Sequence, residues 1–228
     1  MDILQYIDTV YSEAIIFDEI EKKIISFARK NSIPYLLPVK GKILSCITRL
    51  KNPKNILEIG LGSGFSTYIL LKSTDDNSKI ISIDFNFFRI NDFFENIFKQ
   101  LPEKYKTKLT VYPLDIFYAL DKFMEIEKKF DLIFLDSTKR DYLELLPLLV
   151  EILDNNGILL CDNITYGNQT FKNIAKRSEN YLQGVELLHK FNKKLLSYDF
   201  LHTCFIPVAD GMSLSIKTSE DKIKWTFL

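Results

Sequence analysis

The sequence predicts one α/β domain whose seven-stranded sheet is mostly parallel and covered by helices on both faces. Short, continuously apolar segments alternate with helix-like segments from residue 53 to residue 197, which is the pattern of successive βαβ units. Two further apolar segments are joined by Asp210-Gly211, which indicates an antiparallel hairpin at the end of the sheet. A chain of 228 residues with 46% hydrophobic content can bury the core of such a domain.

Each element follows from local patterning. Residues 1–52 are predicted to form an N-terminal helical cap, because apolar residues recur at helical spacing and prolines then interrupt the pattern. Residues 53–217 are expected to form the core and 218–228 a tail of the same single domain. The predicted strands are 55–59, 79–84, 109–112, 130–136, 157–161, 202–206 and 212–216, and the predicted helices are 3–14, 16–27, 42–50, one after residue 64, 91–101, 142–153 and 170–197.

Composition and charge argue against some classes of function. The formal net charge is zero, so no global basic field favours nucleic acid, although residues 21–54 carry nine Lys or Arg against one acidic residue. Solvated helix faces are the alternative explanation of that local excess. No segment resembles a signal peptide or reaches membrane-spanning length. Cys46, Cys161 and Cys204 lack C-x-x-C spacing and are interpreted as buried hydrophobes, which predicts a cytoplasmic protein.

A glycine-rich turn is the most informative motif. Gly60, Gly62 and Gly64 follow a predicted buried strand, and without Cβ atoms they permit a sharp turn and close approach of a ligand. The dinucleotide fingerprint G-x-G-x-x-G would need glycine where Phe65 stands, which argues against a nicotinamide oxidoreductase. The pattern E-x-G-x-G-x-G instead resembles the loop that cradles S-adenosylmethionine (SAM) in class I methyltransferases. Glu58 could hold the ammonium end of that cofactor; a ligand-free turn is the alternative.

Further acidic residues stand at the ends of the next two strands. Asp84 lies about 20 residues beyond the glycine loop, the distance at which a carboxylate meets ribose hydroxyls. Asp115 follows the third strand, where it would meet an adenine edge. Each could instead cap the following helix. Ligands of doubly wound sheets bind at the carboxyl ends of the strands, so both residues are candidates for cofactor binding.

The fourth and fifth strands also end in oxygen donors. Asp136 and Asp162 would lie on adjacent strand ends, with backbones about 5 Å apart. Two carboxylates held so close repel each other unless a cation or proton lies between them. With the amide oxygen of Asn163 they form a set of hard donors that suits Mg²⁺. Lys139, three residues after Asp136, is the candidate general base. The alternatives are that Asp136 caps a helix and that Asp162-Asn163 forms an Asx-turn.

Together these segments resemble the metal-dependent O-methyltransferase family that includes catechol and caffeoyl-CoA O-methyltransferases and bacterial tRNA hydroxyuridine methyltransferases. The matching segments are Lys40–Ile43, Leu57–Ser66, Ile81–Asp84, Phe130–Tyr142, Cys161–Asn163 and Pro207–Gly211. The resemblance implies a class I methyltransferase fold. It also implies cofactor contacts by Glu58, Gly60, Gly62, Gly64, Ser66, Asp84, Asp115 and Asp136, metal ligation by Asp136, Asp162 and Asn163, and catalytic roles for Lys139 and Asp136.

The predicted activity is therefore Mg²⁺-dependent methyl transfer from SAM to a hydroxyl acceptor. The acceptor is either 5-hydroxyuridine in a tRNA anticodon loop or a small catechol-like metabolite; a SAM-binding protein without turnover is the alternative from another class. The final hairpin resembles that of bacterial members, and Cys204 stands where animal catechol enzymes have an orienting glutamate, so tRNA is preferred. A homodimer without membrane association is expected. The candidate phosphate contacts, besides residues 21–54, are Lys172, Lys176, Arg177, Lys190, Lys193 and Lys194.

Overall fold

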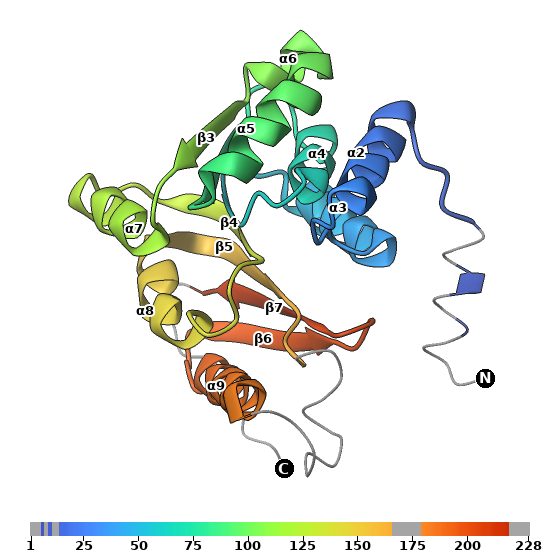
Figure 1. The fold of residues 1–228 in the computed structure, drawn as a ribbon. Coiled ribbons are helices and arrows are strands. Elements are labelled where there is room, and N and C mark those ends of the chain that lie inside the picture. Colours follow the sequence, from blue (N-terminus) through green and yellow to red (C-terminus); the bar gives the residue numbers. More distant parts are fainter. Residues whose placement is uncertain (1–5, 7–8, 11–13, 166–178, 219–228) are drawn as a thin grey trace.

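The computed structural model of the protein describes residues 6, 9–10, 14–165 and 179–218. Its centre is a seven-stranded sheet of order β3-β2-β1-β4-β5-β7-β6 (Figure 1). The first five strands are parallel to their neighbours, and β7 is antiparallel to both β5 and β6, as the sequence predicts. The strands are β1 Asn55–Ile59, β2 Lys79–Asp84, β3 Leu109–Pro113, β4 Phe130–Leu135, β5 Leu153–Asp162, β6 Leu201–Ile206 and β7 Met212–Lys217.

Most strands lie where the apolar segments place them, and β5 is the exception because it begins four residues before the predicted start at 157. The added residues include the polar stretch 154–156, which gives no strand signal in the sequence. Leu153 pairs with Phe130, and the register between β4 and β5 then shifts before Leu132. Asn156 has φ +59°, so the strand is irregular at this point and regular only from Gly157 onward.

The helices of the described residues are α2 Glu19–Lys30, α3 Pro38–Lys51, α4 Phe65–Ser73, α5 Phe87–Asn96, α6 Glu103–Lys106, α7 Ile116–Glu125, α8 Tyr142–Ile152 and α9 Glu179–Leu196, with a 3₁₀ turn η1 at Phe98–Gln100. The third helix begins at Pro38, four residues earlier than predicted, because proline fits the first helical position. The sequence pattern predicts neither α6 nor α7. Residues 170–178 of the last predicted helix, and much of the predicted helix at 3–14, lie outside the described residues.

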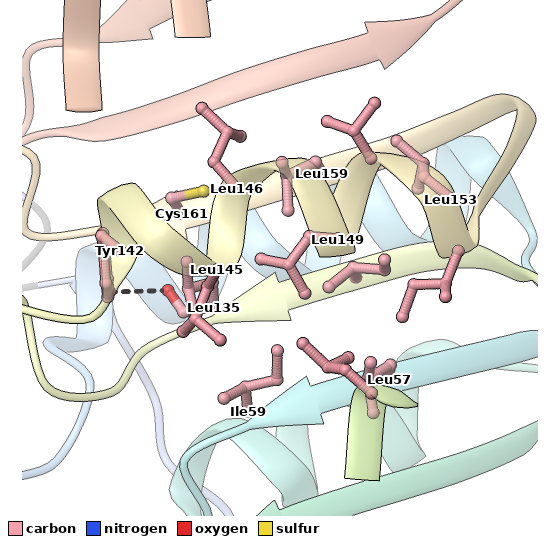
Figure 2. Close-up of a cluster of buried hydrophobic side chains, with 14 of the residues drawn as sticks. Leu57, Ile59, Leu135, Tyr142, Leu145, Leu146, Leu149, Leu153, Leu159 and Cys161 are labelled. Carbon is pink, nitrogen blue, oxygen red and sulfur yellow. Dashed lines mark hydrogen bonds between the residues drawn. The ribbon is translucent and has the colours of Figure 1, made fainter. Parts of the chain in front are cut away.

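Two apolar layers enclose the sheet. On one face α7, α8 and α9 pack against the strands, and Figure 2 shows part of this cluster, in which Leu57, Leu135 and Leu149 are buried. On the other face α2, α3, α4 and α5 pack through residues such as Leu44 and Phe93. The strands are therefore buried on both faces, as expected for a parallel sheet. A ligand would therefore approach the sheet at the carboxyl ends of its strands.

Two sequence-based expectations about the surface have different outcomes. The cysteines were expected to be buried, but only Cys161 is, whereas Cys46 and Cys204 are exposed. Their apolar neighbours belong to half-buried elements, so neighbouring hydrophobicity does not determine the direction of each side chain. None of the helices in the described part of the chain is long and apolar enough to cross a membrane.

Candidate active site

A cavity of about 390 Å³ opens where β1, β2 and β4 end. This is the edge at which ligands bind in doubly wound sheets. The predicted site residues that line it are Gly60, Gly62, Ser66, Asp84, Asp115, Asp136, Lys139 and Asn163. Glu58, Gly64 and Asp162 do not line it. The structure thus brings most of the predicted site residues to the lining of one cavity and leaves these three outside that lining.

The glycine loop needs its glycines for different reasons. Gly60 has φ +103°, and a Cβ there would lie 1.9 Å from the carbonyl oxygen of Asp136. A Cβ on Gly64 would lie 2.3 Å from the ring of Phe93. A Cβ on Gly62 would lie at an ordinary contact distance, 3.4 Å, from the Pro34 carbonyl oxygen, but φ is +54°, a conformation that residues with a Cβ disfavour. The loop therefore lies directly against the end of β4, and this contact joins the predicted cofactor loop to Asp136.

Glu58 lies under the loop. Its side chain is 0% exposed and accepts hydrogen bonds from the hydroxyls of Ser66 (2.6 Å), Thr67 (2.6 Å) and Ser82 (2.7 Å). Burial raises the pKa of Glu58 to about 7, although the three hydroxyl donors oppose the shift. In this arrangement the carboxyl group joins β1 and β2 to the start of α4. Direct contact between Glu58 and a cofactor remains a prediction.

Asp84 and Asp115 face the cavity while each binds backbone. Asp84 is 7% exposed; its Oδ2 accepts from the amide of Gly62 at 3.2 Å and its Oδ1 from that of Asn86 at 2.9 Å. Asp115 caps α7 by accepting from the amides of Phe117 and Tyr118. The helix-cap alternative therefore describes Asp115 correctly, and its position in the cavity wall is compatible with that role.

Lys139 lies between Asp136 and Tyr142. Its Nζ donates to Oδ1 of Asp136 at 2.8 Å and to the phenol oxygen of Tyr142 at 2.9 Å. The Tyr142 hydroxyl lies 3.0 Å from the carbonyl oxygen of Leu135 (Figure 2) and 3.2 Å from that of Asp162, so its proton is directed to backbone. Complete burial raises the pKa of Tyr142 well above its usual value, which keeps the phenol protonated. Sequence reasoning assigned Tyr142 no role; its only signal was its position three residues after Lys139.

Lys40 and Asp210 form a second group that sequence reasoning missed. The Lys40 side chain is 1% exposed, and its Nζ donates to Oδ1 of both Asp162 and Asp210. Burial raises the pKa of Asp162 to about 6; the Asp136 carboxylate adds to this shift and Lys40 opposes it. Lys40 lies in the matched segment before β1 and Asp210 in the hairpin turn. Neither position alone signals a contact with a strand end.

The contacts at the strand ends leave one oxygen of each predicted metal ligand without a donor among the described residues. Asp136 uses Oδ1 for Lys139, Asp162 uses Oδ1 for Lys40 and for the amide of Asn163, and the Asn163 amide group donates through Nδ2. No residue that the structure describes donates to Asp136 Oδ2, Asp162 Oδ2 or Asn163 Oδ1. Asn163 has φ +56°, a strained conformation that Asn tolerates best among non-glycine residues.

The donor chemistry of these three oxygens fits a hard divalent cation, since two are carboxylate oxygens and one is an amide oxygen. In the described part of the chain no group of three or more His, Cys, Asp or Glu could hold a metal ion. A metal centre here therefore depends on the amide of Asn163 and on water or acceptor oxygens for its remaining positions.

A cavity at the strand ends, lined by a glycine loop and by acidic residues at or just after the ends of successive strands, is typical of SAM-dependent methyltransferases of class I. The sequence model described as O-methyltransferase matches residues 10–218, so the chain belongs to this O-methyltransferase family and is an enzyme that uses SAM. It is 27% identical over 187 residues to caffeoyl-CoA O-methyltransferase 1 of Eucalyptus globulus, covering 79% of this chain and 73% of that protein. It is 26% identical to caffeoyl-CoA O-methyltransferase 2 of Petunia hybrida, covering 79% and 75%.

Solved structures support the fold. The O-methyltransferase TomG of Streptomyces achromogenes, in complex with SAM, superposes with a TM-score of 0.79 at 20% identity, covering 96% of this chain and 100% of that one. An O-methyltransferase of Bacillus cereus in complex with SAH gives 0.74 at 18% identity, covering 95% and 97%. The predicted fold class and the predicted methyltransferase class are confirmed.

Proposed function

We propose that the protein is a Mg²⁺-dependent O-methyltransferase in which Asp136, Asp162 and Asn163 hold the metal ion. The observation that carries this proposal is that each of these residues keeps one oxygen free of donors among the described residues. Asp136 and Asn163 also line the cavity. When bound, SAM supplies an electrophilic methyl group and Mg²⁺ acidifies an acceptor hydroxyl.

The side chains of the cavity then have distinct tasks. The glycine loop and Asp84 hold the cofactor side, with Ser66 and Asp115 in the same wall. As the neutral amine, Lys139 would take the acceptor proton at Nζ as general base and become the ammonium ion that pairs with Asp136. Tyr142 and Asp136 hold that nitrogen at the edge of the cavity, at 2.9 and 2.8 Å. Holding base and acceptor near reacting distance provides much of the rate acceleration in such reactions.

Metal dependence can be tested separately from cofactor binding. Asp162→Ala and Asn163→Ala should abolish methyl transfer while SAM affinity, measured by calorimetry, stays near that of the wild type. Asp131→Ala is a matched control, because the Asp131 carboxylate also binds backbone, at the opposite end of the sheet. Full turnover of chelator-treated wild-type enzyme would show that the metal mechanism is wrong.

For the acceptor we propose 5-hydroxyuridine in a tRNA anticodon loop. Three exposed aromatic residues, Phe85, Phe87 and Phe88, follow β2, and Phe85 also lines the cavity together with Arg89. Exposed aromatic rings beside an arginine can stack on unpaired RNA bases. Basic residues that could meet phosphates include the exposed Lys190, Lys193 and Lys194. The other candidates, Lys172, Lys176 and Arg177, lie outside the described residues.

A small catechol-like acceptor is the second candidate, favoured by the names of the caffeoyl-CoA relatives. Cys204, which stands where animal catechol enzymes have an orienting glutamate, is exposed on β6 and does not line the cavity. Incubation with radiolabelled SAM and either bulk tRNA or a catechol panel, with and without Mg²⁺, separates the two. Robust turnover of a catechol with no methylation of tRNA from a strain that lacks this gene would reject the tRNA proposal.

The remaining proposals concern assembly and location. We infer a homodimer that acts in the cytoplasm, from the resemblance to the metal-dependent O-methyltransferase family. Sedimentation of the purified protein tests the first, and fractionation of the source cells tests the second.

A further inference from the structure

The Asp210-Gly211 pair, which the sequence marks only as a hairpin turn, contacts the segment that carries the proposed metal ligands. The antiparallel register places Asp162 opposite Met212, so the turn lies beside the end of β5 (Figure 1). The amide of Thr165 donates to the carbonyl oxygen of Asp210 at 3.0 Å, and the Thr165 hydroxyl donates to the same oxygen at 2.7 Å. The backbone of the turn thus fixes the chain just after Asn163.

The side chain of Asp210 makes two further contacts, one with the Asn163 amide group and one with the Lys40 ammonium group. Its Oδ2 accepts from Nδ2 of Asn163, which directs the amide oxygen of Asn163 away from Asp210 and leaves that oxygen without a donor among the described residues. Its Oδ1 accepts from Nζ of Lys40, which also donates to Asp162. The Asp210 carboxylate therefore determines which end of the Asn163 amide is available. It also shares the Lys40 ammonium group, which would otherwise pair with Asp162 alone.

We propose that Asp210 is a positioning residue for the metal centre, holding the Asn163 amide with its oxygen available and drawing Lys40 away from exclusive pairing with Asp162. This inference rests on the proposed function. Without Asp210 the amide is free to turn its nitrogen toward the cation position. The Lys40 ammonium, 1% exposed, would then have no carboxylate partner but Asp162 among the described residues and would compete with a divalent cation for it. Both effects weaken metal binding.

The test is a calorimetric titration of Mg²⁺ into wild type, Asp210→Ala and Asp210→Asn, followed by a titration of SAM. Partners that orient metal ligands typically change metal affinity about 10- to 100-fold, so we expect a loss of that size in Asp210→Ala. Asp210→Asn keeps the size of the side chain and an acceptor oxygen but loses the charge, so its loss should be smaller. SAM affinity should stay within about twofold of wild type, because Asp210 does not line the cavity.

A double variant separates the two effects. If Lys40 competes for Asp162, then Lys40→Met combined with Asp210→Ala should recover part of the lost Mg²⁺ affinity. No recovery would overturn the part of the proposal that concerns Lys40 and leave the orientation of Asn163 as the cause of the loss. Asp131→Ala and Asp131→Asn are matched controls, because Asp131 also fixes backbone, through the amides of Lys54 and Asn55 at 2.7 Å. Thermal unfolding without metal identifies any variant that fails to fold.

The outcomes are distinct. Mg²⁺ affinity of both Asp210 variants within twofold of wild type would overturn the positioning role, as would equal losses in the Asp131 controls. If wild type itself binds no Mg²⁺, the proposed metal dependence fails and the inference falls with it. Weaker Mg²⁺ binding with unchanged SAM binding, confined to the Asp210 variants, supports it.

Discussion

At the scale of single residues, Glu58 shows how burial changes the behaviour of a carboxyl group. It has no exposed surface and its partners are three neutral hydroxyls, so the ionised form is disfavoured relative to water. In the unfolded chain the same group would titrate near 4.5, whereas in the fold its pKa is about 7. The folded protein therefore holds a proton that the unfolded chain releases, and stability becomes dependent on pH.

The first prediction concerns that dependence. Between pH 4.5 and 7 the unfolded chain releases the Glu58 proton first, so the free energy of unfolding should fall as pH rises, relative to Glu58→Gln. The full difference is about 3 kcal/mol and is constant above this window. Urea unfolding of both proteins at several pH values measures it. Asp162 contributes a pH dependence of the same sign to wild type and to Glu58→Gln, so its contribution cancels in the comparison. If the free energy of unfolding changed with pH in parallel in the two proteins, Glu58 would not be the cause.

The second prediction concerns Lys139. Lys139→Met removes the nitrogen that lies 2.8 Å from Asp136 and should lower kcat by about 100-fold or more, because a positioned general base contributes that much. SAM affinity should change little. Lys128→Met is a control, since that lysine donates to Asn55 at the other end of the sheet. A wild-type kcat in Lys139→Met would remove Lys139 from the mechanism.

At the scale of elements, the turn from β1 into α4 fixes the geometry of two strand ends. Gly60 lets the loop lie against the carbonyl of Asp136, and the amide of Asp136 donates back to Ile59 at 2.9 Å. The cofactor loop and the candidate metal ligand thus share one backbone contact. A substitution in that turn should therefore affect both the cofactor side of the cavity and the side with the candidate metal ligands.

The third prediction compares two glycines of this turn. Gly60→Ala would place Cβ 1.9 Å from the Asp136 carbonyl, so backbone must move, and both thermal stability and SAM affinity should drop sharply. In Gly62→Ala the new Cβ would make an ordinary contact with the Pro34 carbonyl oxygen at 3.4 Å, so its cost is the left-handed conformation, about 1–2 kcal/mol. Thermal unfolding and calorimetry rank the two. A Gly62 variant that loses more stability than the Gly60 variant would contradict this account of the loop.

The extent to which the sequence predicts these elements depends on where their side chains point. The strands β1 and β2 lie at the predicted residues because buried parallel strands are unbroken apolar segments between turns. The start of α5 was missed because Phe87 and Phe88 are exposed there, so apolar residues occupy the outer face. The adjacency of Asp136 and Asp162 follows from strand order alone. The contact of Lys40 with Asp162 does not, since it depends on how α3 packs.

At the scale of the whole molecule, a neutral protein must bind tRNA through local groups of charge, because its net charge supplies no long-range attraction. The exposed lysines of α9 form one such group in the described residues: Lys190, Lys193 and Lys194. Contacts between lysines and phosphates release counterions, so binding weakens as salt rises. A neutral phenol makes no such contacts.

The fourth prediction uses this difference. Raising salt from about 50 to about 200 mM should lower kcat/KM for tRNA about tenfold if two or three phosphates are contacted, while methylation of a catechol should barely change. Charge reversal at Lys193 and Lys194 should raise KM for tRNA without altering SAM affinity; Lys99→Glu, on the 3₁₀ turn η1, is a control. Salt-insensitive methylation of tRNA would contradict the phosphate contacts.

The Lys40 ion pairs also bear on the order in which the site can form during synthesis. Lys40 is separated by 122 residues from Asp162 and by 170 from Asp210. Contacts between positions so distant along the chain form late and slowly in folding, because a long loop must close first. The glycine loop and Asp84, separated by 22 residues, need only the first sheet strands. A nascent chain can therefore build the cofactor side of its cavity well before the final hairpin emerges to complete the acceptor side.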